Sequence, residues 1–152
     1  MENDDPVIVS EHRVSFQNTE EMNDVLVDKA DITLYAISST RFELGKASRM
    51  LKAEGIKCNI VHIMWLKPFV VSGRLTGPLN KSGLGLVIDA GYEIAGASQS
   101  IAYRLNQATD HRVKALGLYD RTKCICPALQ NRAPDAKRIY ETVKEMLRKP
   151  LQ

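Results

Sequence analysis

Residues 84–98 read LGLVIDAGYEIAGAS, an apolar run followed by a glycine-bounded turn and the start of a helical pattern. The turn nearly matches the phosphate-binding motif G-x-x-x-x-G-K-[ST], but Ala97 stands where that motif has its lysine. Glu93 adds a negative charge inside the turn, which would oppose a bound phosphate. We therefore interpret the segment as a structural turn, in which Gly91 permits a tight backbone and Gly96 lets the following helix pack closely on the sheet.

Four apolar runs of this kind predict four β-strands. They are nearly continuous rather than alternating, which is typical of strands that are buried on both faces of a largely parallel sheet. Helical patterns lie between the runs, so the order of elements predicts an α/β/α sandwich. The expected strands are Ile32–Ile37, Ile60–Met64, Leu84–Ala90 and Val113–Tyr119.

Three segments show the spacing of helices with one apolar face. The first opens with Thr40-Arg-Phe-Glu43, a capping-box pattern, and Gly55 is well placed to end it. The glycines and proline between Pro68 and Ser82 predict only a short helix or an irregular crossover. The buried stripes that we expect are Leu44, Ala47 and Leu51, then Ala97, Ile101, Leu105 and Ala108, and, after a helix start at Pro134-Asp135, Ile139, Val143 and Leu147.

Length and composition indicate one ordinary globular domain. The chain has 152 residues and a net charge of +3, and its lysines and arginines are spread among the acidic residues, so no nucleic-acid surface is indicated. No apolar run approaches the ~20 residues of a membrane span, and the acidic start MENDDP is not a signal peptide. Three cysteines fit a reducing, cytoplasmic location better than a disulfide framework.

The sequence offers no metal site and no catalytic constellation. Cys124 and Cys126 are too close together for the usual zinc pairing and have no second pair of ligands. No Ser/His/Asp order, H-E-x-x-H motif or pair of carboxylates suited to catalysis is present. We therefore assign no catalytic residue and no metal ligand.

A small-molecule crevice is the candidate site that the residues themselves suggest. Asp89 ends a predicted parallel strand, and open α/β sheets bind ligands at the carboxyl ends of their strands. Helix capping is the alternative for the hydroxyl residues, and capping of the next turn is the alternative for Asp89. The candidate crevice consists of Ser39, Thr40, Lys67, Asp89, Gly91 and Gly96.

The order of these segments resembles the C-terminal domain of the transketolase superfamily. Family members run D-V-T-L-x-A-x-G, L-x-x-x-G-I, V-I-D-L-R-x-L-K-P-L-D, V-V-D-E-G-x-x-x-G-G-x-G and a late P-x-x-x-L-E. The beta-type subunit of 2-oxo acid (pyruvate-type) dehydrogenases and 1-deoxyxylulose-5-phosphate synthase are the most similar in pattern. The matching segments here are 31–38, 51–56, 60–68, 85–91 and 126–130, and residues 5–12 resemble the segment by which a pyrimidine-binding domain leads into this one.

The resemblance implies a fold and a supporting role. The fold would be a three-layer α/β/α sandwich with a five-stranded, mostly parallel (mixed) sheet. Residues 1–30 would lead from an absent pyrimidine-binding domain, and residues 31–152 would form the transketolase C-terminal-like domain. Its role would be dimerisation, without catalysis of its own.

In the parent enzyme other domains, or an alpha-type subunit, would hold thiamine diphosphate and magnesium through a G-D-G motif, which this chain lacks. The parent would be a 2-oxo acid dehydrogenase or a transketolase-type transferase, and a dihydrolipoyl acyltransferase is a further partner in the first case. His62, Trp65 and Tyr92 are the residues that we expect near subunit contacts, with ordinary core packing as the alternative.

The chain also departs from the family pattern. His62-Ile63-Met64 replaces D-L-R, Ala90 replaces the glutamate of the turn, and Ala95 replaces the first of two glycines. These departures admit a divergent member that uses another 2-oxo acid or a sugar phosphate. A stand-alone binding or regulatory module on the same fold, and a small-anion binder at the crevice, are the other functions that the sequence leaves open.

Overall fold

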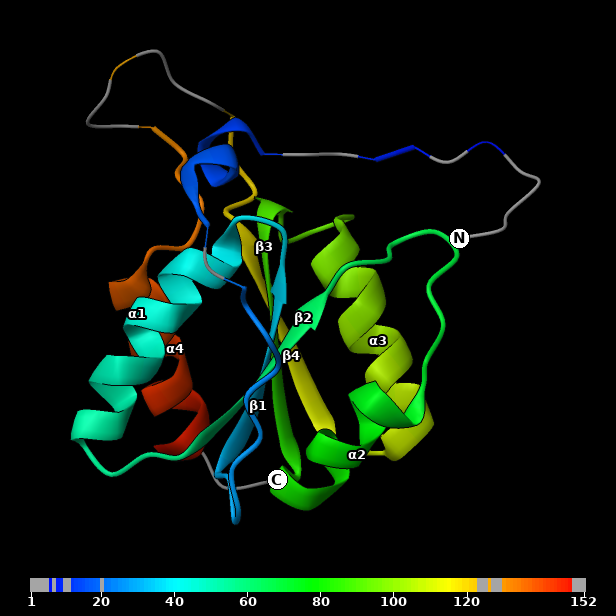
Figure 1. The fold of residues 1–152 in the computed structure, drawn as a ribbon, viewed down its shortest axis with the longest axis vertical. Helices are drawn as coiled ribbons and strands as arrows, with labels where there is room; N and C mark the ends of the chain where they lie inside the picture. Colours follow the sequence, from blue (N-terminus) through cyan, green and yellow to red (C-terminus); the bar gives the residue numbers. More distant parts are fainter. Residues whose placement is uncertain are drawn as a thin grey trace.

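A parallel β-sheet forms the middle layer of the computed structural model, which describes residues 6, 8–9, 12–19, 21–122, 126 and 130–148 (Figure 1). Neighbouring strands pair in parallel throughout the order β2-β1-β3-β4. This confirms the α/β fold with a parallel sheet that the continuous apolar runs predicted. The strands are β1 (Ile32–Ile37), β2 (Cys58–Ile63), β3 (Leu84–Tyr92) and β4 (Arg112–Leu118).

The described residues form four strands, not the five that the family resemblance implied. An antiparallel fifth position is taken by Val25 alone, whose N–H and C=O pair with Ile60 on the outer edge of β2 at 2.8 and 2.7 Å. The ladder stops there because side chains accept the neighbouring amides. The N–H of His62 donates to the Asp24 carboxylate (2.8 Å), and that of Val27 donates to an asparagine side chain (2.9 Å). The sheet is therefore mixed only at a single bridge.

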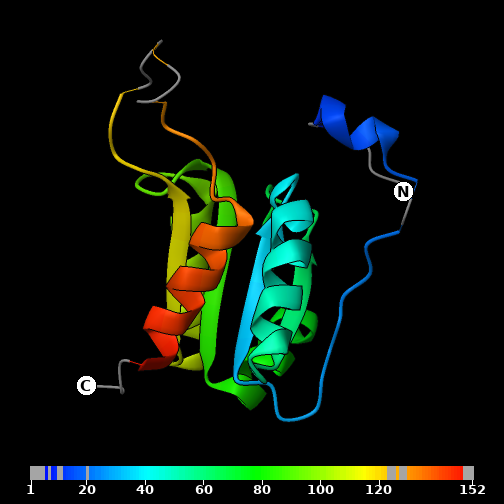
Figure 2. The ribbon, with the colours of Figure 1, turned by 90° about the vertical axis from the view of Figure 1, so that its left-hand side faces the viewer.

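Two helices cover each face of the sheet. Helices α1 (Thr40–Ala53) and α4 (Ala136–Arg148) lie side by side on one face, as Figure 2 shows, and α2 (Gly73–Ser82) and α3 (Ala97–Thr109) cover the other. The part of the leading segment that is described contains a 3-10 helix, η1 (Arg13–Gln17). The boundary at residue 30 and the preceding pyrimidine-binding domain stay predictions.

The strands supply a separate apolar core to each helical layer. In β1, Ile32 and Leu34 pack toward α1 and α4, whereas Tyr35 and Ile37 pack toward α2 and α3. Every residue of β1 is consequently buried, which explains why the run shows no alternation. Each such aliphatic side chain contributes about 1.5–3 kcal/mol by leaving water. The buried hydroxyl of Tyr35 is satisfied because it donates to the carbonyl oxygen of Leu75 at 2.6 Å.

Helix ends follow the glycine and proline signals. Gly55, with a φ of 79°, follows α1, and Gly83, with a φ of 68°, follows α2. Both lie in the left-handed region that glycine adopts without a steric cost. Helix α2 is short and contains Pro78, which confirms the expectation of a short helix between Pro68 and Ser82.

The apolar stripes of the helices are largely as expected, with two errors. The predicted stripe of α1 is fully buried, and so are Ile139 and Val143 of α4. Leu147 is 37% exposed and Met146 takes its place, because seven residues from Ile139 make almost two complete helical turns and eight do not. Ala108 in the last turn of α3 is also exposed, and Ala102 is buried instead.

The capping box expected at Thr40 is not formed. The N-cap residue is Ser39, whose side chain makes no capping hydrogen bond, and the helix begins at Thr40 itself. The Thr40 hydroxyl therefore lies inside the first turn and donates to the carbonyl oxygen of Ile37 (2.7 Å). The Glu43 carboxylate instead accepts the N–H of Ala136 (2.9 Å), so it links α1 to the start of α4.

Candidate functional site

The six residues of the predicted crevice lie along one edge of the sheet, where all four parallel strands end. We call this end of the sheet the carboxyl edge, as distinct from its edge strands β2 and β4. Two of the six follow β1, one follows β2, two belong to the last part of β3, and one lies just before α3. They are, in that order, Ser39 and Thr40, Lys67, Asp89 and Gly91, and Gly96.

Thr40 is part of the packing at this edge. Its side chain is only 3% exposed, and its hydroxyl lies 2.7 Å from the carbonyl oxygen of Ile37 and 3.1 Å from that of Ile88. The hydroxyl therefore connects the end of β1 to β3. Asp89 is the residue after Ile88 in β3, and its Oδ2 lies 2.9 Å from the point that a Cβ atom on Gly91 would occupy. The carboxylate thus lies over the backbone of the turn.

Backbone contacts decide the shape of the turn after β3. A Cβ atom on Gly96 would lie 1.9 Å from the carbonyl oxygen of Tyr92, and one on Gly117 would lie 2.6 Å from that of Gly91. Real Cβ atoms do not approach this closely, so both positions require glycine. Ala95 has a φ of 58°, a left-handed conformation that costs an L-residue roughly 1–2 kcal/mol. The geometry agrees with the interpretation of this segment as a structural turn.

Glu93 places its charge inside the same turn. Its carboxylate accepts the N–H of Gly117 at 3.3 Å and lies 3.9 Å from Nη2 of Arg138, while its own N–H donates to Leu118 at 3.0 Å. Glu93 therefore connects the end of β3 with β4 and α4.

His62 is the buried member of a partly exposed polar cluster between β2, α2 and the segment before β1. The residue is 7% exposed, its N–H donates to Asp24, and its carbonyl oxygen accepts from Nη2 of Arg74 at 2.7 Å. Asp24 and Arg74 form an ion pair at 2.8 Å. Burial lowers the pKa of His62, although the nearby Asp24 carboxylate opposes the shift, so the imidazole is neutral near pH 7. The assignment of His62 to a subunit contact stays a prediction.

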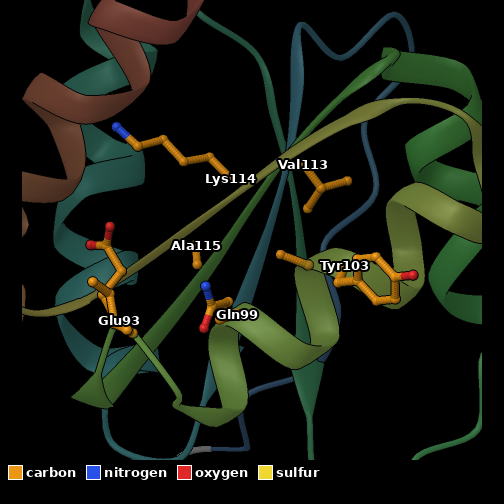
Figure 3. Close-up of a pocket in the computed structure, with 8 residues that line it drawn as sticks. Glu93, Gln99, Tyr103, Val113, Lys114 and Ala115 are labelled. Carbon is orange, nitrogen blue, oxygen red and sulfur yellow. The ribbon is translucent and has the colours of Figure 1, made fainter.

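None of the six crevice residues lines either of two cavities on the described surface. The first, of about 340 Å³, lies between α3 and the outer side of β4. Figure 3 shows Glu93 and Gln99 at one end of it and Tyr103 and Val113 at the other. The second, of about 350 Å³, lies where β4 ends and α4 begins. The crevice around Asp89 stays a prediction.

Asn131 organises the second region, and the sequence analysis did not single it out. Its side chain accepts the N–H of Tyr119 (3.1 Å) and donates to the carbonyl oxygens of Tyr119 (2.7 Å) and Arg121 (3.1 Å). Asn131 is only 6% exposed, so these bonds are shielded from water. The sequence signal that could have drawn attention to this region is the presence of three arginines, at positions 121, 132 and 138, shortly after the last strand.

Thiols and acidic side chains do not gather into a metal site in the part of the chain that the structure describes. No group of three or more histidine, cysteine, aspartate or glutamate side chains there could hold a metal ion. Burial, with a smaller effect of Asp31, raises the pKa of the Cys58 thiol to about 12, so this thiol stays protonated. Cys126 is exposed, and Cys124 lies outside the described residues. None of the described helices is both long enough and apolar enough to cross a bilayer.

The family model for the transketolase C-terminal domain matches residues 23–139. The chain belongs to this family. A search of curated proteins gives no match. The family assignment therefore rests on the sequence model, and the fold of the chain agrees with it.

Two solved structures share the fold of this transketolase C-terminal domain. One is described as "Split gene transketolase, inactive beta4 tetramer", with a TM-score of 0.67, 20% identity, and coverage of 82% of this chain and 41% of that one. The other is 2-oxoglutarate:ferredoxin oxidoreductase from Magnetococcus marinus, with a TM-score of 0.60, 18% identity, and coverage of 90% and 21%. At these identities the likeness shows the fold alone. The chain spans less than half the length of either relative.

The carboxyl edge of this transketolase C-terminal domain exposes large apolar side chains. Two of the three predicted interface residues are among them, since Trp65 is 45% and Tyr92 is 42% exposed. Their neighbours after β2 and β3 are also exposed. We call the following set the apolar edge: Met64, Trp65, Leu66, Tyr92 and Ile94.

Proposed function

We propose that this chain is the C-terminal interface domain of a thiamine-diphosphate-dependent enzyme of the transketolase or 2-oxo acid dehydrogenase group. The family match over residues 23–139 supports this role. The chain spans only 41% and 21% of its two structural relatives, which leaves the cofactor-binding parts to other domains or to a separate subunit. The domain itself would stabilise a dimer and would carry out no chemistry.

The observation that carries the proposal is the apolar edge. Met64 and Trp65 are 70% and 45% exposed, and they follow β2 directly. Water contact with these side chains is unfavourable by about 25 cal/mol for each Å² of apolar surface, so a partner that covers the edge gains free energy. Aromatic residues and methionine are also enriched at the centres of protein interfaces.

Residues of this chain do not fit the cofactor itself. The sequence contains no Gly-Asp-Gly, and the described residues include no cluster of acidic or histidine ligands for magnesium. In our proposal, thiamine diphosphate and magnesium are therefore held by a pyrimidine-binding domain or an alpha-type subunit. This chain contributes a rigid sandwich that holds two such subunits in register.

One relative offers a direct analogy for such an arrangement. The structure with the higher TM-score is described as a split-gene transketolase in the form of an "inactive beta4 tetramer", where beta4 names the subunits and not strand β4. We carry this description over as part of the proposal, so the chain alone is inactive and associates with itself. A 2-oxo acid or a sugar phosphate is the substrate of the parent enzyme, a dihydrolipoyl acyltransferase is a further partner if the parent is a dehydrogenase, and the cytoplasm is the location.

Sedimentation velocity on a matched pair of variants tests the interface. Met64→Asp places a charge on the apolar edge, whereas Met50→Asp makes the same change in the second half of α1, where the methionine is 39% exposed. We expect the wild-type chain and Met50→Asp to sediment as dimers or larger at micromolar concentration. Met64→Asp should raise the dissociation constant at least about tenfold, because burying an unpaired carboxylate is costly.

The opposite result would favour a stand-alone module. A wild-type chain that stays monomeric at 100 times the concentration, or two variants that weaken association equally, would contradict a role for the apolar edge. Titration with thiamine diphosphate and magnesium adds a second check, because the chain alone should bind thiamine diphosphate no more tightly than inorganic pyrophosphate.

A further inference from the structure

Three of the seven residues that line the second cavity are arginines, and the interface role does not use this cavity. It lies at the carboxyl edge, where the end of β4 and the start of α4 come side by side (Figure 2). Its volume of about 350 Å³ falls in the range of small-molecule sites. The residues that line it include Tyr119, Arg121, Gln130, Arg132, Asp135 and Arg138.

A buried side chain holds the two walls of this cavity in place. Asn131 makes three hydrogen bonds to the backbone of Tyr119 and Arg121, as described above, and it is 6% exposed. Through these backbone hydrogen bonds, the Asn131 side chain links the start of the β4–α4 connection to its end. Arg121 adds a bond from its Nη2 to the carbonyl oxygen of Gln130 at 3.4 Å. The cavity is therefore built on a fixed backbone.

Two of the arginines are oriented by one aromatic ring. The guanidinium carbon of Arg138 lies 3.7 Å from the centre of the Tyr119 ring, and that of Arg121 lies 5.5 Å from the same centre. Such contacts hold a guanidinium group while leaving its N–H donors in the plane available for hydrogen bonds. Tyr119 is 52% exposed and Arg121 is exposed, whereas the side chain of Arg138 is only 17% exposed.

Acidic groups only partly balance this positive charge. Nη2 of Arg138 lies 3.9 Å from the Glu93 carboxylate, which is near the limit for an ion pair, and Nη1 is buried without a hydrogen-bond partner among the described residues. Asp135 is the one carboxylate on the cavity wall, and it caps α4 by accepting the N–H of Arg138 at 2.8 Å. Three arginines and one aspartate line the cavity, and the Glu93 carboxylate beside it offsets part of the charge of Arg138.

The end of helix α4 does not account for this site. The N–H of Ala136 is already taken by the Glu43 carboxylate, and the N–H of Arg138 is taken by Asp135. The affinity for an anion must therefore come from the guanidinium groups. Arginine binds the oxygens of phosphate and carboxylate groups through paired hydrogen bonds, which are stronger than bonds between neutral groups.

We propose that this cavity binds the oxyanion group, a phosphate or a carboxylate, of a small metabolite. Arg121 and Arg132 supply the donors at the open side, and Arg138, held by Tyr119, supplies positive charge at the inner wall. The site lies apart from the crevice around Asp89 that the sequence suggested, and it does not depend on the interface role.

Isothermal titration of the full chain with pyrophosphate and with citrate, at constant ionic strength, tests the site. Pyrophosphate represents phosphoryl ligands and citrate represents carboxylates. We expect at least one of them to bind, and Arg121→Gln and Arg132→Gln each to weaken that binding about tenfold. The matched control is Arg49→Gln, an exposed arginine in the second half of α1, which should bind as tightly as the wild type.

The two ligands and the control make each outcome decisive. Binding of pyrophosphate alone assigns a phosphate site, binding of citrate alone assigns a carboxylate site, and binding of both assigns a general oxyanion site. The proposal is overturned if neither binds, or if Arg49→Gln weakens binding as much as the two cavity variants do. Arg121 and Arg132 are exposed, and a circular-dichroism melt confirms that each variant is folded before titration.

Discussion

The turn after β3 and the connection after β4 begin at the same edge of the sheet, but they are held in different ways. Residues 93–96 connect β3 to α3, and their path is set by backbone atoms that pack against the positions of Gly96 and Gly117. Residues 119–135 connect β4 to α4, and in their described part the path depends on the side chain of Asn131. The first arrangement excludes side chains, whereas the second relies on one.

This difference predicts how each connection responds to mutation. Added atoms should disrupt the turn after β3, because there is no space for them. Removed atoms should loosen the connection after β4, because nothing else replaces the three hydrogen bonds. Added atoms in the turn after β3 affect the whole fold, because this turn joins strand β3 to helix α3. Loss of the Asn131 hydrogen bonds acts mainly on the cavity beside Tyr119.

Gly96→Ala should give the largest effect. The new Cβ would lie 1.9 Å from the carbonyl oxygen of Tyr92, so the backbone of the turn must move. We expect a loss of about 3 kcal/mol in the free energy of unfolding, measured by urea denaturation. Gly45→Ala is the control, because nothing lies within 4 Å of its Cβ position inside α1, and alanine there should stabilise the chain by up to ~1 kcal/mol. Equal midpoints for Gly96→Ala and the wild type would contradict the tight turn.

Asn131→Ala should have an intermediate effect. The variant leaves the N–H and C=O of Tyr119 without their partner, which we expect to cost about 2 kcal/mol in unfolding free energy. Hydrogen exchange should become faster at the Tyr119 amide. Asn106→Ala, which removes a single bond to the carbonyl oxygen of His111, is the control and should cost less than about 1 kcal/mol. An unchanged exchange rate at Tyr119 would show that Asn131 does not hold this connection.

Ala95→Gly should give the smallest effect, with the opposite sign. Glycine relieves the left-handed conformation at a φ of 58°, although it also gives the unfolded chain more freedom. The net expectation is a gain of about 0.5–1 kcal/mol, read from the urea midpoint. Ala97→Gly, at the first position of α3, is the control and should destabilise the chain by a similar amount. A loss of stability in Ala95→Gly would mean that the turn carries no strain.

Much of the fold could be predicted because its strands are buried on both faces. The run Ile32–Ile37 is β1 to the residue, and the predicted bounds of the other strands differ from the structure by two residues at most. The predictions from the sequence differed from the structure where a side chain forms an unexpected hydrogen bond with the backbone. The five-stranded sheet implied by the family resemblance has four strands in the described residues, because the Asp24 carboxylate takes an amide beside the Val25 bridge. The capping box was wrong because Glu43 bonds to α4 instead of its own helix.

The candidate site was harder to predict, because its contacts join residues that are distant in the chain. Asn131 meets Tyr119 across 12 positions, and Asp24 meets His62 across 38. Hydrophobic period and local spacing carry no information on such pairs. The residues around Asp89 were chosen from the general rule for open α/β sheets, which indicates the edge but not the place along it.

The bridge at Val25 also limits how copies of this chain can assemble through their sheets. It occupies the outer side of β2, whereas β4 pairs only with β3 in the described part of the chain. An unpaired edge strand can accept a strand from another molecule, but each copy has one such edge to offer. Two copies that pair through their β4 strands leave only their β2 strands at the ends of the joined sheet, and the outer side of each β2 is already occupied by Val25. Assembly by strand addition is therefore closed at a pair and cannot extend into a fibre.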